Sequence, residues 1–212
     1  MNTMTRIVKL VALVAALLLS ARTPAADPPA KPALLQAETV IWAGLDYSQT
    51  RFYGTEDFKH PEELFPEILE AWNQRFLETL IQDKSEPLSK ALGKRVQPDI
   101  NAVSAGNRAA RSSAIIRQND IFCNESHLKE PDLAEAVRAY KMTSTNGLGL
   151  VFIMDRLVKS EKKGALYRVF FDVATREILA KDRLVVKAGG LTFRKYWFKV
   201  PRDAVKDLKK LL

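Results

Sequence analysis

The stretch from residue 149 to residue 187 constrains the fold most, because its pattern predicts three consecutive strands. Residues 150–158 (LVFIMDRLV) are mostly apolar at successive positions, which is typical of a central strand buried on both faces. Residues 166–173 and 177–187 alternate apolar with polar side chains, and short turn segments separate the three strands. The pattern predicts an antiparallel three-strand meander.

The strongest helical pattern lies between residues 61 and 82. Apolar side chains from Leu64 to Ile81 recur at steps of three and four, which places them on one face of a helix. Because this apolar stripe is wide, we expect the helix, beginning near residue 61 or 65, to pack against a sheet. The preceding residues 39–47 (TVIWAGLDY) are predicted to form a buried strand that runs out into turn-type residues.

The remaining segments are shorter and predict a helix that begins at Pro201 and, before it, five further elements. These are a helix at 87–92, a strand at 95–100, a helix at 102–118, a loop at 119–130 and a helix at 131–142. The order of elements predicts a single α+β domain over residues 37–212. Its mixed sheet should end in the antiparallel three-strand meander and be covered by helices.

The amino terminus has the three parts of a secretory signal. Arg6 and Lys9 make it positively charged, residues 10–19 are an unbroken apolar run, and the residues that follow are small. We expect cleavage after Ala25, with cleavage after Ala26 as the alternative. The apolar run is about half of the roughly 20 residues that a membrane-spanning helix needs, which disfavours an uncleaved anchor.

Cleavage defines the expected mature protein. Residues 1–25 would be removed, residues 26–36 would form an unstructured, Pro-rich lead-in, and no transmembrane segment would remain. The mature protein would then work in the periplasm or outside the cell.

The charge balance bears on the partners. The chain has 33 basic and 25 acidic residues, but Arg6, Lys9 and Arg22 belong to the signal, which leaves 30 against 25 and a net charge of +5. An exported basic protein meets anionic lipids, anionic polymers and acidic proteins more often than nucleic acid. We therefore expect an envelope protein or an anionic envelope polymer as partner, and no nucleic acid.

Cys123 is the only cysteine, so an intramolecular disulfide is impossible and stability must come from core packing. An unpaired thiol in an oxidising compartment is either buried or available for a mixed disulfide. We expect a buried Cys123 that packs as a small hydrophobic side chain.

One short segment carries residue types that suggest catalysis: Asp120, Cys123, Glu125 and His127. A catalytic thiol needs a base within hydrogen-bond reach and a third group that orients the base. We interpret the segment instead as a loop with a structural cysteine and a surface histidine. Two histidines 67 positions apart and one cysteine do not supply the usual zinc ligands, so we predict no metal, no cofactor and no catalytic residue.

Asp46 and Asp155 both stand where predicted strands lose their apolar character. Either could act as a general acid. The structural alternatives are a turn in which Asp46 accepts a hydrogen bond from the backbone at Ser48, and an edge or solvent-facing position for Asp155. An enzyme should bring Asp46, Asp155 or Asp172 together in one pocket.

Residues 187–202 are the candidate binding surface, because cations and aromatic side chains interleave there. The candidate binding residues are Arg194, Lys195, Tyr196, Trp197, Lys199 and Arg202. Such a surface can contact lipid headgroups, stack on sugars or form a protein interface. In the alternative that we favour, the aromatic rings cover the core beneath the last helix and the cations are solvated.

Several segments resemble an uncharacterised family of exported bacterial proteins. They are WAGLDYS (42–48), AWN (71–73), GLGLVFIMD (147–155) and FFDVATREIL (170–179). The resemblance covers most of the mature chain and implies export, but no activity.

The late part also resembles a domain of envelope assembly proteins: the Tol translocation protein, the curli secretion channel and the lipoprotein activators of peptidoglycan synthases. There a strand pair precedes a D-x-x-T-x-E-x-L segment, matched here by Asp172, Thr175, Glu177 and Leu179. This chain lacks the lipoprotein cysteine that many of those proteins carry. The resemblance implies a binding or scaffolding role outside the cytoplasm.

Three functions follow from these observations. The leading hypothesis is an exported, non-catalytic binding or scaffold protein of the cell envelope. One alternative is a small envelope hydrolase or transferase that uses Asp or Glu. The other is a binder of anionic glycan or lipid through residues 193–202.

Overall fold

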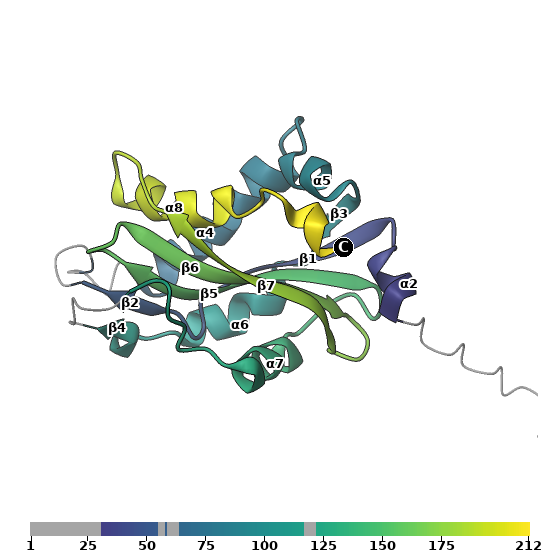
Figure 1. Cartoon of the computed structure of the whole chain (residues 1–212), viewed down its shortest axis with the longest axis horizontal. Helices are drawn as coiled ribbons and strands as arrows, with labels where there is room; N and C mark the ends of the chain where they lie inside the picture. Colours follow the sequence, from purple (N-terminus) through teal and green to yellow (C-terminus); the bar gives the residue numbers. More distant parts are fainter. Residues whose placement is uncertain (1–30, 55–57, 59–63, 117–121) are drawn as a thin grey trace, which may run out of the picture. The chain divides into compact units, whose positions relative to one another are not determined.

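In the computed structural model of the chain, strand β5 (Leu148–Val158) is the centre of a seven-stranded mixed sheet (Figure 1). Along one edge, β5 pairs in parallel with β1 (Thr39–Asp46) and further on with β2 (Arg51–Tyr53). β3 (Arg95–Pro98) extends the sheet beside β1, and β4 (Ile115–Ile116) extends it beside β2, both in parallel. All residues of β5 are buried, as the apolar pattern predicts for a central strand.

The structure describes residues 31–54, 58, 64–116 and 122–212. Residues 31–212 pack as one unit. No helix within the described ranges is long and apolar enough to cross a membrane. The predicted signal sequence, residues 1–25, lies outside these ranges.

The other edge of β5 carries the predicted meander. β6 (Lys163–Asp172) pairs with β5 antiparallel from Leu148↔Asp172 to Val158↔Lys163, and β7 (Ile178–Lys187) pairs with β6 in the same sense. The predicted α+β fold, with a mixed sheet that ends in an antiparallel meander, is confirmed.

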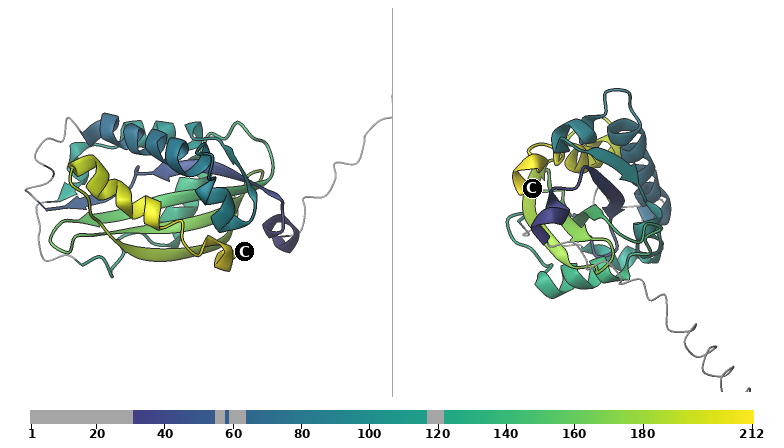
Figure 2. Two further views of the ribbon diagram at one scale, coloured as in Figure 1. Left: turned by 90° about the horizontal axis from the view of Figure 1, so that it is seen from above. Right: turned by 90° about the vertical axis from the view of Figure 1, so that its right-hand side faces the viewer.

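One face of the sheet is covered by α4 (Leu69–Phe76), α5 (Pro87–Leu92) and α8 (Phe193–Asp203). A π-helical turn, Leu77–Ile81, continues α4, as the long apolar stripe predicts. α4 and α8 lie side by side (Figure 2), and the Trp72 indole N–H donates to the Arg194 carbonyl at 3.0 Å.

The opposite face is covered by α6 (Asn101–Ala109) and α7 (Glu130–Ala139). Val103 and Val137 pack there with Val151 and Phe171 of the sheet. The core is therefore divided by the sheet into two apolar layers.

The last helix does not begin at Pro201, and this prediction is wrong. α8 begins after Thr192, whose hydroxyl accepts a hydrogen bond from the Lys195 amide at 3.4 Å, and Pro201 lies inside the helix. Proline has no N–H to donate to the carbonyl four residues back, and its ring crowds that carbonyl, so Pro201 removes one hydrogen bond from the last part of α8. Leu208–Leu211 forms a separate 3₁₀ turn.

Two further boundaries differ from prediction. The helix predicted over 102–118 ends at Ala109, because Ala110 is extended (φ −58°, ψ 143°), and the chain continues into β4. The predicted lead-in 26–36 is also wrong in part, since Lys31–Leu35 forms helix α2 and Leu34 is buried in the core.

Candidate functional site

The candidate site lies at the carboxyl ends of β1 and β3. From β1 the chain continues into β2 and then crosses one face of the sheet through α4 to reach β3. From β3 it passes through α6 on the other face, then through β4 and α7, before it enters β5. In open sheets with parallel strands, ligands bind in the crevice where connections leave adjacent strands on opposite faces.

Gly44 allows α4 and α6 to approach the end of β1. Its φ of +121° lies in the left-handed half of φ space, which disfavours any residue with a side chain. A Cβ at this position would lie 2.7 Å from Val103 Cγ2 and 2.9 Å from Asn73 Oδ1. Gly44 is therefore required both by its backbone and by the close contact with the two helices.

Two buried asparagines then take the place of a neighbouring strand, since β3 ends opposite Trp42. Asn73 of α4 accepts from the Leu45 N–H at 2.7 Å and donates to the Leu45 carbonyl at 2.8 Å. Asn107 of α6 accepts from the Tyr47 N–H at 2.7 Å and donates to the Leu45 carbonyl at 2.9 Å. Their amides satisfy backbone groups that would otherwise be buried without partners.

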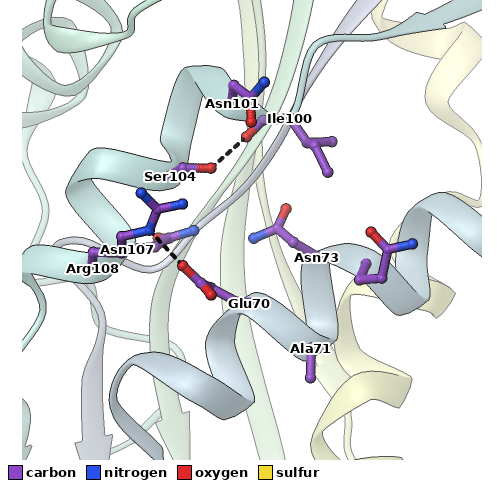
Figure 3. Close-up of a pocket in the computed structure, with 9 residues that line it drawn as sticks. Glu70, Ala71, Asn73, Ile100, Asn101, Ser104, Asn107 and Arg108 are labelled. Atoms are coloured by element: carbon purple, nitrogen blue, oxygen red, sulfur yellow. Dashed lines mark hydrogen bonds and ion pairs between the residues drawn. The ribbon is translucent and has the colours of Figure 1, made fainter.

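A crevice of about 360 Å³ opens between α4 and α6 at this point (Figure 3). Nine residues line it: Glu70, Ala71, Asn73, Gln74, Ile100, Asn101, Ser104, Asn107 and Arg108. The Arg108 Nε lies 2.7 Å from Glu70 Oε1, and both side chains are largely exposed. Most of the lining therefore consists of side chains that can form hydrogen bonds.

Two further cavities, each about 280 Å³, adjoin the segment between β1 and β2. One lies between α6 and α7 and is lined by Asp46, Ser48 and Gln49 on the sheet side. The other is lined by residues 48–51 and by residues 109–114, without residue 112. The short break between the two strands thus contacts two cavities and lies next to the crevice.

Asp46, at the end of β1, is 1 % exposed. Its Oδ1 accepts from the Ser48 N–H at 2.8 Å, which confirms the predicted turn. Its Oδ2 accepts from the Tyr140 hydroxyl at 2.6 Å. Burial, with the charge and hydrogen bond of Asp46, raises the Tyr140 pKa well above its ordinary value, so the hydroxyl remains a donor at neutral pH.

Asp155 is also buried, so the prediction of an edge or solvent-facing position is wrong. A bulge between Met154 and Arg156 leaves it without a partner on β6. Its Oδ2 accepts from Arg183 Nε at 2.9 Å and Nη2 at 2.6 Å, and its Oδ1 lies 2.7 Å from His127 Nδ1. Burial raises the Asp155 pKa, but contacts with His127 and Arg183 outweigh this, and the net pKa is lowered.

His127 is nearly buried rather than a surface histidine, its side chain being 12 % exposed. Its Nε2 lies 2.9 Å from the Gln49 carbonyl oxygen, and its Nδ1 faces Asp155. Both ring nitrogens thus contact acceptors of the protein itself. In this conformation neither nitrogen is available to take a proton from a nucleophile.

The loop that carries Cys123 is tied to this network. Arg183 Nη2 donates to the carbonyls of Cys123 and Glu125, at 2.6 and 2.7 Å, and Arg156 donates to the Phe122 carbonyl at 2.9 Å. Cys123 is buried, as predicted. Burial and the negative charge of Glu161 raise the pKa of its thiol to about 12, which disfavours the reactive thiolate. Asp120 lies outside the described residues.

Asp172, the third candidate carboxylate, accepts hydrogen bonds from the amides of Ala174 and Thr175 in the β6–β7 turn. Among the described residues, it shares no hydrogen-bonding partner with Asp46 or Asp155. Among the described residues, no group of three or more His, Cys, Asp or Glu side chains is placed to hold a metal ion.

The α8 candidates differ among themselves. Trp197 is 1 % exposed in the core, and Tyr196 is partly buried. Arg194 lies 3.2 Å from Glu67, while Lys199 and Arg202 both contact Asp203, at 2.6 and 2.9 Å. Lys195 is exposed. One aromatic ring is thus in the core and three of the four cations have acidic neighbours, which leaves little surface for a strongly charged partner.

Comparison of the chain with protein-family models, with curated proteins and with solved structures gave no match. The two family resemblances suggested by the sequence therefore stay predictions.

The crevice was not predicted from the sequence, although two segments beside it stand out in the sequence. WAGLDYS contains Gly44, Leu45 and Tyr47, and AWN contains Asn73, and the structure brings the two segments together. An asparagine on the apolar face of a helix, as Asn73 is between Trp72 and Phe76, was the signal that could have identified it.

Proposed function

We propose that this chain is an exported, non-catalytic binding protein of the cell envelope, whose ligand lies in the crevice between α4 and α6. The observation that carries the proposal is the crevice at the ends of β1 and β3, lined by hydrogen-bonding side chains from two helices. Its size and lining suit a small polar molecule. Export rests on the signal pattern of residues 1–25.

The positions of the carboxylates that a hydrolase would need favour a binding protein over an enzyme. Asp155 is held by His127 and Arg183, Asp172 by the backbone of a turn, and Asp46 by Tyr140 and Ser48. An acid–base pair needs two groups placed on either side of a reacting bond. Asp46 and Asp155 lie on neighbouring strands, but each is held by its own partners, and Asp172 is held in the β6–β7 turn.

The test is thermal unfolding of the mature protein, beginning at residue 26, with a panel of neutral and acidic sugars and short cell-wall peptides. A ligand present at 100 times its Kd should stabilise the fold by about 2.7 kcal/mol, which raises Tm by roughly 5–10 °C. Ser104→Leu, which fills the crevice wall, should abolish the shift. Lys195→Ala on α8 is the matched control and should keep it.

Two results would contradict the proposal. The crevice is not the site if a compound stabilises the Ser104→Leu variant as much as the wild type. The α8 surface is the better candidate if Lys195→Ala loses the shift. Export is tested separately by the mass of the protein from cells, where an intact Met1 instead of an amino terminus near residue 26 would refute cleavage.

A further inference from the structure

The cavity between α6 and α7 differs in chemistry from the crevice. Five of the eleven residues that line it are alanine or glycine: Ala102, Ala105, Gly106, Ala136 and Ala139. Asp46 and Tyr140, which are both buried, line it, and the exposed Glu135 of α7 also lines it. Small side chains leave the volume of about 280 Å³ open, and the carboxylates make it acidic.

The Asp46 carboxylate has no cationic partner among the described residues. Its two hydrogen bonds come from neutral donors, the Ser48 N–H and the Tyr140 hydroxyl. A carboxylate offers about four acceptor positions, so roughly two remain unused. Buried charges are normally paired, because removal from water costs several kcal/mol per ion. A cation in the cavity would supply the missing partner.

We propose that this cavity binds a small primary ammonium group on a short apolar stem, with Asp46 as its counterion. The ammonium has three donors and matches the unused acceptor positions of the carboxylate. The alanine walls suit the methylene groups of the stem, since burial of each is worth about 0.8 kcal/mol. Glu135 adds negative charge. The proposal goes beyond the crevice function, because the two sites have different linings.

The probe is n-butylammonium chloride, titrated into ¹⁵N-labelled mature protein at constant ionic strength, with backbone amide shifts as the readout. Saturable shifts should be confined to residues 46–49, 102–106 and 135–140. Butanol tests the stem without the charge, and butyrate tests the stem with the opposite charge. Neither should produce these saturable shifts.

Variants test the two parts of the site. Asp46→Asn should weaken binding about tenfold or more, because a buried counterion is lost. Glu135→Gln, on the surface, should weaken it by no more than about fivefold. Ala139→Leu should fill the cavity and abolish binding, and because Ala139 is exposed the fold should be retained. Glu130→Gln, at the start of the same helix and paired with Lys181, should leave binding unchanged.

The proposal is overturned if butylammonium gives no saturable shifts, if butanol binds as well, or if Ala139→Leu binds like the wild type. If Asp46→Asn does not fold, the Ala139→Leu and Glu135→Gln results decide the question. The Ser104→Leu variant should still bind butylammonium, so failure of the crevice proposal and failure of this one are distinguishable.

Discussion

Asp46 and Asp155 are both almost fully buried, and both lie on neighbouring strands near the break between β1 and β2, yet their surroundings differ. Asp155 faces two possible cations, Arg183 and His127, within 3 Å. Among the described residues, Asp46 faces only neutral donors, and it lines a cavity. Two aspartates with similar burial therefore have different roles.

The comparison distinguishes a structural carboxylate, Asp155, from Asp46, a carboxylate with unused hydrogen-bond acceptor positions. The Asp155 network joins β5, β7 and the loop of residues 122–128, and its members are directed at one another. Asp46 holds Tyr140 of the α7 end and the turn at Ser48, but has room for another donor. Burial alone does not identify a functional carboxylate; its partners do.

The largest effect is expected from Asp155→Asn. Arg183 would stay largely buried without its counterion, and breaking a buried ion pair in this way costs about 3–5 kcal/mol. Urea denaturation of the mature protein measures the free energy of unfolding. Asp207→Asn, which removes an exposed pair with Lys210, is the control and should change it by less than about 1 kcal/mol. Equal losses in the two variants would show that the Asp155 network is not stabilising.

A smaller effect is expected from Asp46→Asn. The amide keeps one acceptor for Ser48 or Tyr140 and leaves no cation unpaired, so about 1–3 kcal/mol should be lost. The same urea experiment measures it. A loss as large as that of Asp155→Asn would remove the contrast between the two carboxylates.

The smallest effect is expected in the pH dependence of the contribution that Asp155 makes to the free energy of unfolding. It is also the sharpest test of the contrast between the two aspartates. The pKa of Asp155 is lowered in the folded protein. Its stabilisation should thus be complete above the unfolded pKa, about 4, and be lost as pH falls through the lower folded pKa. The difference in unfolding free energy between wild type and Asp155→Asn, measured by urea from neutral to acidic pH, should shrink. A difference that grows towards low pH would contradict this sign.

The strands of the meander were predicted well from the sequence, because the apolar pattern that identifies each strand lies within that strand. Residues 150–158 and 166–173 lie within β5 and β6 to within a few residues. The start of α8 was predicted wrongly because proline is typical of a first helical turn. The helix begins earlier, after Thr192, whose hydroxyl caps it.

The candidate site was less predictable, because its members come from distant parts of the chain. Asp46 and Tyr140 are separated by 94 positions, and Leu45 and Asn107 by 62. The bulge leaves Asp155 without a partner residue on β6. It depends on the register between β5 and β6, which the residues around Asp155 do not reveal. The partners of Asp155 could not be foreseen for the same reason.

The α+β class, the order of the meander strands and the burial of Cys123 could be predicted from the residues alone, since these features follow from local apolar periodicity and residue type. Which buried aspartate contacts arginine and which lines a cavity became clear only from the folded arrangement. That choice depends on contacts across the sheet, and the free energy of a buried charge is determined by the groups within a few ångströms of it, not by its neighbours in sequence.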